Sequence, residues 1–143
     1  MKLALGTAQF GLDYGVANDA GQVSVVEAQE ILSLATGSGI DVLDTAIAYG
    51  TSEEVLGKVG VDRFSVVTKL PSLPPDGEDD IARWVRDQVE ALLARLGQKQ
   101  IYGLLLHRPN DLLGAKSKLL TGALMSLKEA GVVQKIGVSI YSP

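Results

Sequence analysis

The segment from residue 44 to residue 57 reads DTAIAYGTSEEVLG and joins the end of an apolar strand to a polar loop and a short helix. Asp44 directly follows a pair of apolar residues, and Tyr49 stands further along the loop. Glu53 and Glu54 then favour the start of a helix, because their negative charge opposes the positive end of the helix dipole. Polar groups just past an apolar strand are typical of α/β folds, which place their chemistry at the carboxyl ends of the strands.

Along the whole chain, short apolar runs alternate with helical patterns. Glycine, proline or a polar residue bounds each run, as is typical of buried strands. We expect five strands, over residues 2–8, 39–44, 63–69, 101–107 and 135–140. Apolar residues spaced three and four apart predict four helices, over residues 24–37, 52–58, 78–96 and from Leu120 to a turn at Gly131. The first of these has a capping box at its start, in which Ser24 precedes Glu27 by three residues.

Strands that alternate with helices over short connections predict a parallel sheet in an α/β fold. The two candidates are a doubly wound sheet and part of a (β/α) barrel. A doubly wound nucleotide-binding fold carries a Gly-x-Gly-x-x-Gly turn after its first strand. The corresponding segment, Gly6-Thr7-Ala8-Gln9-Phe10-Gly11, does not fit that pattern.

Composition excludes several classes of function. The 143 residues carry 17 acids and 13 bases, and the bases form no cluster that could neutralise a row of phosphates. There is no cysteine, so a disulfide framework or a thiolate metal site is impossible. No apolar stretch reaches the roughly 18 residues that a membrane span requires. We therefore expect a cytoplasmic protein with no metal site, no nucleic-acid partner and no membrane partner.

Four polar groups follow three consecutive predicted strands, namely Asp44, Tyr49, Lys69 and His107. Each has a simple structural explanation: a turn aspartate, a tyrosine on the rim of the domain, a solvated lysine and a hydrogen-bonding histidine. Parallel strands end at one edge of a sheet, however, so all four groups meet there. Their shared position favours a site over four independent coincidences.

The four side chains together suit proton delivery. A tyrosine serves as a general acid only when its neighbours tune it and aim its hydroxyl at the reacting oxygen. Lys69 would supply the positive charge, Asp44 would keep that lysine charged and in place, and His107 would donate a hydrogen bond to the same substrate oxygen. None of these groups can supply a hydride, so a reduction requires a cofactor.

Several motifs resemble the N-terminal part of the aldo/keto reductases: Gly6-Thr7 with Phe10-Gly11, the pattern from Asp44 to Gly57, Thr68-Lys69, Leu106-His107-Arg108-Pro109 and Gly137-Val138-Ser139. The resemblance implies a (β/α)₈ TIM barrel that uses NADPH to reduce an aldehyde or ketone. Tyr49 would be the proton donor, Lys69 and Asp44 its tuning pair, and His107 would orient the carbonyl.

The same resemblance assigns a set of cofactor contacts. Gly6, Thr7 and Asp44 would approach NADPH, and Ser139 would hydrogen-bond the nicotinamide carboxamide. One departure is Ile140, where many members of the family have an asparagine. The segments that bind the adenosine phosphate end of the cofactor belong to later parts of the barrel in that family.

Length separates this chain from a complete barrel, which needs about 250 residues and eight strands. We expect residues 1–143 to be the N-terminal portion of the barrel, a single domain with five strands and four helices. Open sheet edges predict self-association and little activity of the chain alone. Two alternatives stay open: a non-catalytic assembly or binding module, and an aldolase-like barrel in which Lys69 forms a Schiff base.

Overall fold

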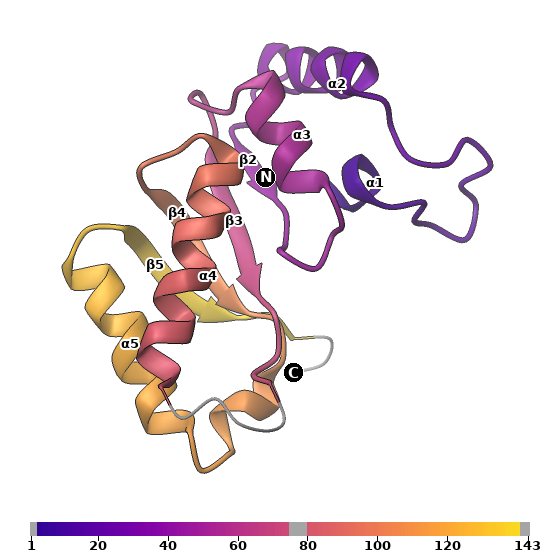
Figure 1. Ribbon diagram of the computed structural model, residues 1–143. Coiled ribbons are helices and arrows are strands. Elements are labelled where there is room, and N and C mark those ends of the chain that lie inside the picture. The colour runs from indigo at the N-terminus through magenta and orange to yellow at the C-terminus, as the bar shows by residue number, and fades with distance from the viewer. Residues whose placement is uncertain (1–2, 75–79, 141–143) are drawn as a thin grey trace.

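A computed structural model describes residues 3–74 and 80–140 of the chain (Figure 1). Five parallel strands form one sheet: β1 (Leu5–Gly6), β2 (Val42–Asp44), β3 (Ser65–Leu70), β4 (Ile101–Leu106) and β5 (Val133–Val138). Their order in the sheet is the order along the chain. A doubly wound sheet reverses its strand order at a switch point, whereas a barrel does not. The observed order therefore rejects the doubly wound alternative.

The helices form a layer against this sheet. Figure 1 shows α2 (Val25–Gly37), α3 (Ser52–Val59), α4 (Ile81–Leu96) and α5 (Ser117–Glu129) following one another along it in chain order. The predicted capping box at Ser24 is present, with the Glu27 side chain bonded back to the Ser24 backbone. Gly97 ends α4 in the left-handed region, at φ 65°. The core fills the space between the two layers.

The buried core combines strand residues with one face of each helix. Leu43, Val66 and Leu104 face the helices from three neighbouring strands. The helices contribute Leu32, Val55, Val85, Leu92, Leu120 and Leu124, among others. Trp84 lies half-buried and packs against this cluster. The sheet and the helices therefore pack together through this core, and the ends of the strands lie outside it.

Some element boundaries differ from the prediction. Within the described residues, β1 covers Leu5–Gly6 and ends there because the chain turns into a single-turn helix, α1 (Ala8–Gly11). Residue 2 of the predicted strand lies outside the described residues. β5 begins at Val133 rather than residue 135, because Val133 pairs with Ile101 directly after the glycine turn. The short 3₁₀ helix η1 (Pro109–Leu112) is also unpredicted, since a single turn has no periodicity to read.

The predicted start of the third long helix falls partly outside the described residues. Its first-turn acids Glu78 and Asp79 and most of the preceding loop belong to residues 75–79. Within the described part, Asp80 caps α4 and accepts a hydrogen bond from the Arg83 backbone at 2.9 Å.

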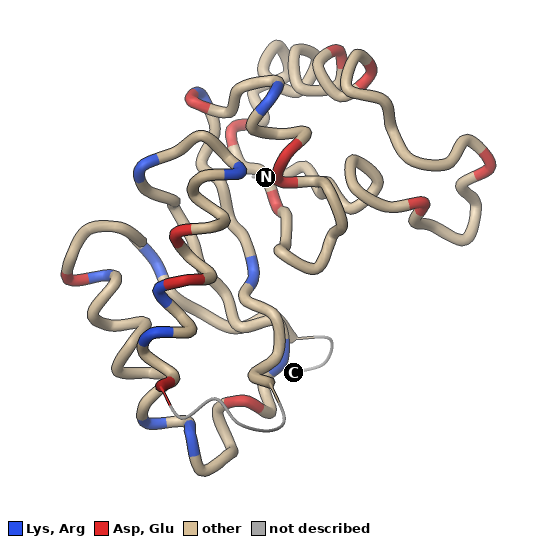
Figure 2. The backbone as a smooth tube through the Cα atoms, viewed as in Figure 1, with Lys and Arg blue, Asp and Glu red and all other residues tan. Residues whose placement is uncertain are grey.

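Charge is distributed unevenly over the fold. Figure 2 shows acidic residues around α1 and α2, whereas the basic residues lie toward α3, α4 and α5. Between residues 3 and 57 the sequence contains no lysine or arginine. Among the described helices, none combines the length and apolar character needed to cross a bilayer.

Candidate active site

The sheet brings the four predicted side chains to one edge. Asp44 is the last residue of β2, Lys69 lies near the end of β3, and His107 directly follows β4. Tyr49 comes from the loop between β2 and α3. Because these strands are parallel neighbours in register, their carboxyl ends lie side by side.

The Lys69 ammonium is the centre of the group. It donates to Asp44 Oδ2 at 2.8 Å, to the Thr45 carbonyl at 3.0 Å and to the Tyr49 hydroxyl oxygen at 3.3 Å. Its three N–H groups therefore each have an acceptor. The Lys69 side chain is 6% exposed, whereas that of Asp44 is 38% exposed. A charge this deeply buried is retained because a carboxylate and two further oxygens replace its water.

Tyr49 and His107 lie against each other beside this ammonium. Their ring centroids are 6.1 Å apart with an interplanar angle of 85°, an edge-to-face arrangement. Lys69 Nζ also lies 4.9 Å from the centroid of the Tyr49 ring. The phenol and the imidazole can thus face one small molecule from two sides, with the positive charge beneath the phenol.

The pKa of His107 is lowered from its ordinary value of 6.5. Burial is the largest cause, followed by the positive charges of Lys69 and Arg108, while the Asp44 carboxylate opposes the shift. These surroundings favour the neutral imidazole, which carries one N–H donor and one acceptor nitrogen. A neutral histidine can donate a hydrogen bond to a substrate oxygen without competing with Lys69 as a second cation.

Close backbone contact holds the Tyr49 loop against α1. A Cβ added at Gly11 would overlap the Tyr49 carbonyl oxygen and the Ser52 amide nitrogen. Gly50 has φ +56°, and a Cβ there would overlap the Gly11 carbonyl oxygen. The sequence pattern contains both glycines but gives no sign that they touch, because the contact joins segments far apart in the chain.

The predicted cofactor residues occupy different environments. Space above Gly6 is open, since an added Cβ would meet no atom within 4 Å. Ser139 is half-buried at the end of β5, and its N–H donates to the Leu106 carbonyl at 2.9 Å. Thr7 is completely buried, with its hydroxyl donating to the Asp44 carbonyl at 3.1 Å. The contact of each with a cofactor stays a prediction.

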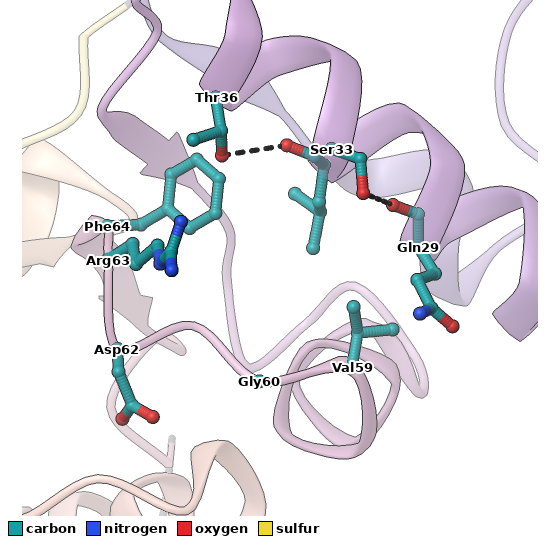
Figure 3. A pocket seen from close by; sticks show the side chains of 9 residues that line it. Gln29, Ser33, Thr36, Val59, Gly60, Asp62, Arg63 and Phe64 are labelled. Atoms are coloured by element: carbon teal, nitrogen blue, oxygen red, sulfur yellow. Dashed lines mark hydrogen bonds between the residues drawn. The ribbon is translucent and has the colours of Figure 1, made fainter.

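Among the hollows in the described part of the molecule, two lie at opposite ends of the strands. One of about 610 Å³ adjoins His107 and is also lined by Ala48, Pro71, Ser72, Arg108, Pro109 and Asn110. The other, of about 450 Å³, lies between α2 and the residues before β3 (Figure 3). There the Ser33 and Thr36 hydroxyls bind carbonyls of their own helix. Of the four predicted site residues, His107 lines the first hollow and none lines the second.

Sequence reasoning missed two contributors to the site. The Thr45 carbonyl accepts a hydrogen bond from Lys69. Every residue has a backbone carbonyl, so the sequence does not reveal which one accepts. Ser52 is completely buried and hydrogen-bonds Thr7, although its position at a helix start suggests a solvated residue. The motif from Asp44 to Gly57 contained both residues without assigning either a role.

Comparison with known proteins gives a consistent result. Residues 2–143 match the model of the aldo/keto reductase family. The chain is 31% identical over 160 residues to the 6-dehydroglucose reductase of Agrobacterium fabrum, covering 99% of this chain and 52% of that protein. It is 35% identical over 127 residues to an aldo-keto reductase of Mycolicibacterium vanbaalenii, covering 85% of this chain and 43% of that protein.

Solved structures agree with the sequence relatives. A protein of Pseudomonas aeruginosa assigned to the aldo-keto reductases superposes with a TM-score of 0.78 at 34% identity, over 95% of this chain and 54% of that one. The predicted fold, a parallel TIM-barrel arrangement present as an incomplete barrel, is thereby confirmed. The chain spans about half the length of the relatives it matches. Because the family model matches nearly all of its residues, the chain belongs to the aldo/keto reductase family.

Proposed function

We propose that this chain carries the catalytic groups of an oxidoreductase that uses NADPH to reduce an aldehyde or ketone to an alcohol. The observation that carries the proposal is the Lys69 ammonium, 2.8 Å from Asp44 and 3.3 Å from the Tyr49 hydroxyl. An ammonium within hydrogen-bond reach of a phenol stabilises the negative charge that develops on the phenol oxygen as its proton is transferred. The name of one relative, 6-dehydroglucose reductase, supports a carbonyl substrate.

The residues at the strand ends fit the nicotinamide end of such a cofactor. The open space above Gly6 lets a ligand approach the backbone closely. The Asp44 carboxylate is 38% exposed, and Ser139 stands half-buried beyond β5. Gly6, Asp44 and Ser139 would hold the nicotinamide end of NADPH, which would supply the hydride when bound. Thr7 would support this place from beneath, through its bonds to Asp44.

The side chains of the chain have separate tasks in this reaction. Tyr49 gives its hydroxyl proton to the substrate oxygen as negative charge develops there. His107, as a neutral imidazole, donates a hydrogen bond to the same oxygen and fixes its direction. Lys69 stays charged throughout and stabilises the tyrosinate that remains. The hollow beside His107 provides room for the rest of the substrate.

An aldolase-like reaction through a Schiff base at Lys69 is a competing enzyme class. A Schiff-base lysine must lose its proton and face the substrate. Here each N–H of Lys69 has an acceptor and the side chain is 6% exposed. This geometry supports the reductase, and borohydride trapping of a carbonyl substrate on Lys69 would instead favour the aldolase.

A non-catalytic assembly module is the other candidate, supported by the unpaired edges of β1 and β5 in the described sheet. It predicts that no aldehyde or ketone consumes NADPH in the presence of the protein. The reductase predicts turnover that depends on Tyr49.

The decisive experiment replaces Tyr49 with phenylalanine in the form of the protein that turns over NADPH. Tyr49→Phe keeps the ring and removes the proton donor, so turnover should fall by roughly 10²- to 10⁴-fold while NADPH affinity stays nearly unchanged. Tyr102→Phe, which removes a hydroxyl near the opposite end of β4, is the matched control and should retain turnover. A Tyr49→Phe protein with more than about a tenth of wild-type turnover would reject Tyr49 as the acid.

A further inference from the structure

Three buried hydroxyl side chains lie beneath the site, and none of them touches the substrate in the reaction described above. Thr7 follows β1, Thr45 follows β2, and Ser52 begins α3. Each residue is 0% exposed. A buried hydroxyl without a partner costs stability, so the partners of these three indicate what they do.

The hydrogen bonds of the three hydroxyls run in one direction. Thr7 Oγ1 donates to the Asp44 carbonyl at 3.1 Å, which uses its proton. Ser52 Oγ donates to Thr7, whose carbonyl and hydroxyl oxygens lie at 2.9 and 3.0 Å. The Thr45 hydroxyl lies 3.1 Å from Ser52 Oγ. Because Ser52 uses its own proton toward Thr7, Thr45 is the donor in this bond. This series of hydrogen bonds therefore runs from Thr45 through Ser52 and Thr7 to Asp44.

The first and last residues of this hydrogen-bond series, Thr45 and Asp44, are also the residues that hold the Lys69 ammonium. Lys69 donates to the Asp44 carboxylate at 2.8 Å and to the Thr45 carbonyl at 3.0 Å. The Ser52 backbone N–H donates in addition to the Tyr49 carbonyl at 3.0 Å. Ser52 thus ties the Tyr49 loop to the segment that binds Lys69.

Helix capping does not account for the Ser52 hydroxyl. The N-cap of α3 is Thr51, and its side chain makes no capping bond. Ser52 directs its hydroxyl to Thr7 and Thr45, away from the free amides of its own helix. The Ser52 hydroxyl therefore binds the residues that follow β1 and β2.

We propose that Ser52, Thr45 and Thr7 are positioning residues that keep the Lys69 ammonium within reach of the Tyr49 hydroxyl. The Asp44 carboxylate is 38% exposed, so water competes with Lys69 for it. The three hydroxyls fix the backbone of Asp44 and Thr45. The Asp44 carboxylate oxygen and the Thr45 carbonyl oxygen then stay turned toward the ammonium. The effect on catalysis rests on the proposed function, whereas the effect on Lys69 does not.

The test compares variants that differ in a single hydroxyl. Thr45→Val removes the hydroxyl and keeps the branched shape, and Thr45→Ser keeps the hydroxyl and removes the methyl group. Ser52→Ala removes the middle of the hydrogen-bond series. Leu124→Ala, a core truncation in α5, controls for general loss of stability, which a melting curve records for every variant.

The first readout is the labelling rate of Lys69 by an amine reagent, followed by mass spectrometry in the native protein. Exposed Lys58 serves as the internal reference. Loss of one hydrogen bond should raise the Lys69 rate about fivefold in Thr45→Val and Ser52→Ala. Thr45→Ser and Leu124→Ala should keep the wild-type ratio of Lys69 to Lys58.

The second readout is the NMR titration of His107, the one histidine in the sequence. Asp44, Lys69 and Arg108 are the charged groups that act on it. A displaced Lys69 should raise the His107 pKa in Thr45→Val and Ser52→Ala but not in Leu124→Ala. Wild-type labelling and titration in Thr45→Val and Ser52→Ala would overturn the proposal, as would equal effects of Thr45→Val and Thr45→Ser.

Turnover separates this proposal from the proposed function. If the hydroxyl variants loosen Lys69 and also lower turnover at unchanged NADPH affinity, both stand. If they loosen Lys69 while the wild-type protein reduces no carbonyl compound, the positioning role stands and the reductase fails.

Discussion

Lys69 shows how one buried charge constrains the residues around it. Its ammonium needs three acceptors, and the structure supplies a carboxylate, a backbone carbonyl and a phenol. Any of these that moved would leave an N–H of a buried cation without a partner, at a cost of several kcal/mol for a charged group. The same requirement that keeps Lys69 paired also keeps Tyr49 beside it.

His107 gives a prediction about stability and pH. Its pKa is lowered in the folded chain, by burial and then by Lys69 and Arg108, so the unfolded chain takes up the proton first as the pH falls. The stability that neutral His107 contributes is therefore complete above its unfolded value of about 6.5 and is lost as the pH falls through the lower folded value.

Melting curves between about pH 8 and pH 5 should show this loss in the wild-type chain and a smaller loss in His107→Gln. Equal slopes in the two proteins would contradict the direction of the His107 shift. The carboxylates common to both proteins serve as the internal control, because they titrate in each.

At the level of secondary-structure elements, a buried ion pair joins α3 to α4 and β3. The Glu53 side chain is 2% exposed and lies 2.8 Å from Arg95 of α4. Its other oxygen accepts the Thr68 hydroxyl at 2.7 Å, next to Lys69 in β3. A Cβ at Gly57 would overlap the Arg95 carbonyl oxygen, so the two helices are in direct backbone contact there.

Glu53 and its neighbour Glu54 form a matched pair for measuring that ion pair. Glu53→Gln should lower the free energy of unfolding by about 2–3 kcal/mol, less than the 3–5 of a fully buried pair because Arg95 is 28% exposed. Exposed Glu54→Gln should change it by less than about 0.5 kcal/mol. Chemical denaturation measures both, and equal values would show that Glu53 acts only through the helix dipole.

The described part of the whole molecule has two unlike sides. α2 lies at one side, where Val26 is 68% and Leu34 is 72% exposed, and its charges are acidic. α5 lies at the other side, with Leu119 58% exposed and Lys118 and Lys128 along it. The outer edges of β1 and β5 are unpaired in the described sheet. Apolar surface and opposite charge together favour association of one copy with another.

We therefore predict that the 143-residue chain self-associates as its concentration rises. Sedimentation velocity should show a growing population of dimers or larger species, and Leu34→Gln should reduce it while leaving the melting temperature nearly unchanged. Added salt should weaken the charge contribution, because it screens exposed charges. A clean monomer at high concentration would contradict this prediction.

Much of the fold is local in origin and could be predicted from the residues. The capping box at Ser24, the left-handed glycine that ends α4 and the alternation of apolar runs with helices depend on neighbours within a few positions. The short elements α1 and η1 could not be predicted, because one turn is too short for a period. The early start of β5 depends on pairing with Ile101 in β4.

The residues of the candidate site likewise include some that the sequence predicts and others that only the tertiary structure reveals. The meeting of Asp44, Lys69 and His107 at one edge could be predicted from the sequence, because a polar residue that ends an apolar strand has a known place in a parallel sheet. Tyr49, in the loop after β2, could be placed at the same edge. What holds them could not be identified. The Thr45 carbonyl, the direction of the Ser52 hydroxyl and the contact of Gly11 with the Tyr49 loop join residues remote along the chain. Such contacts form only when the strands are aligned, and folding selects them because buried polar groups must find partners wherever the backbone places them.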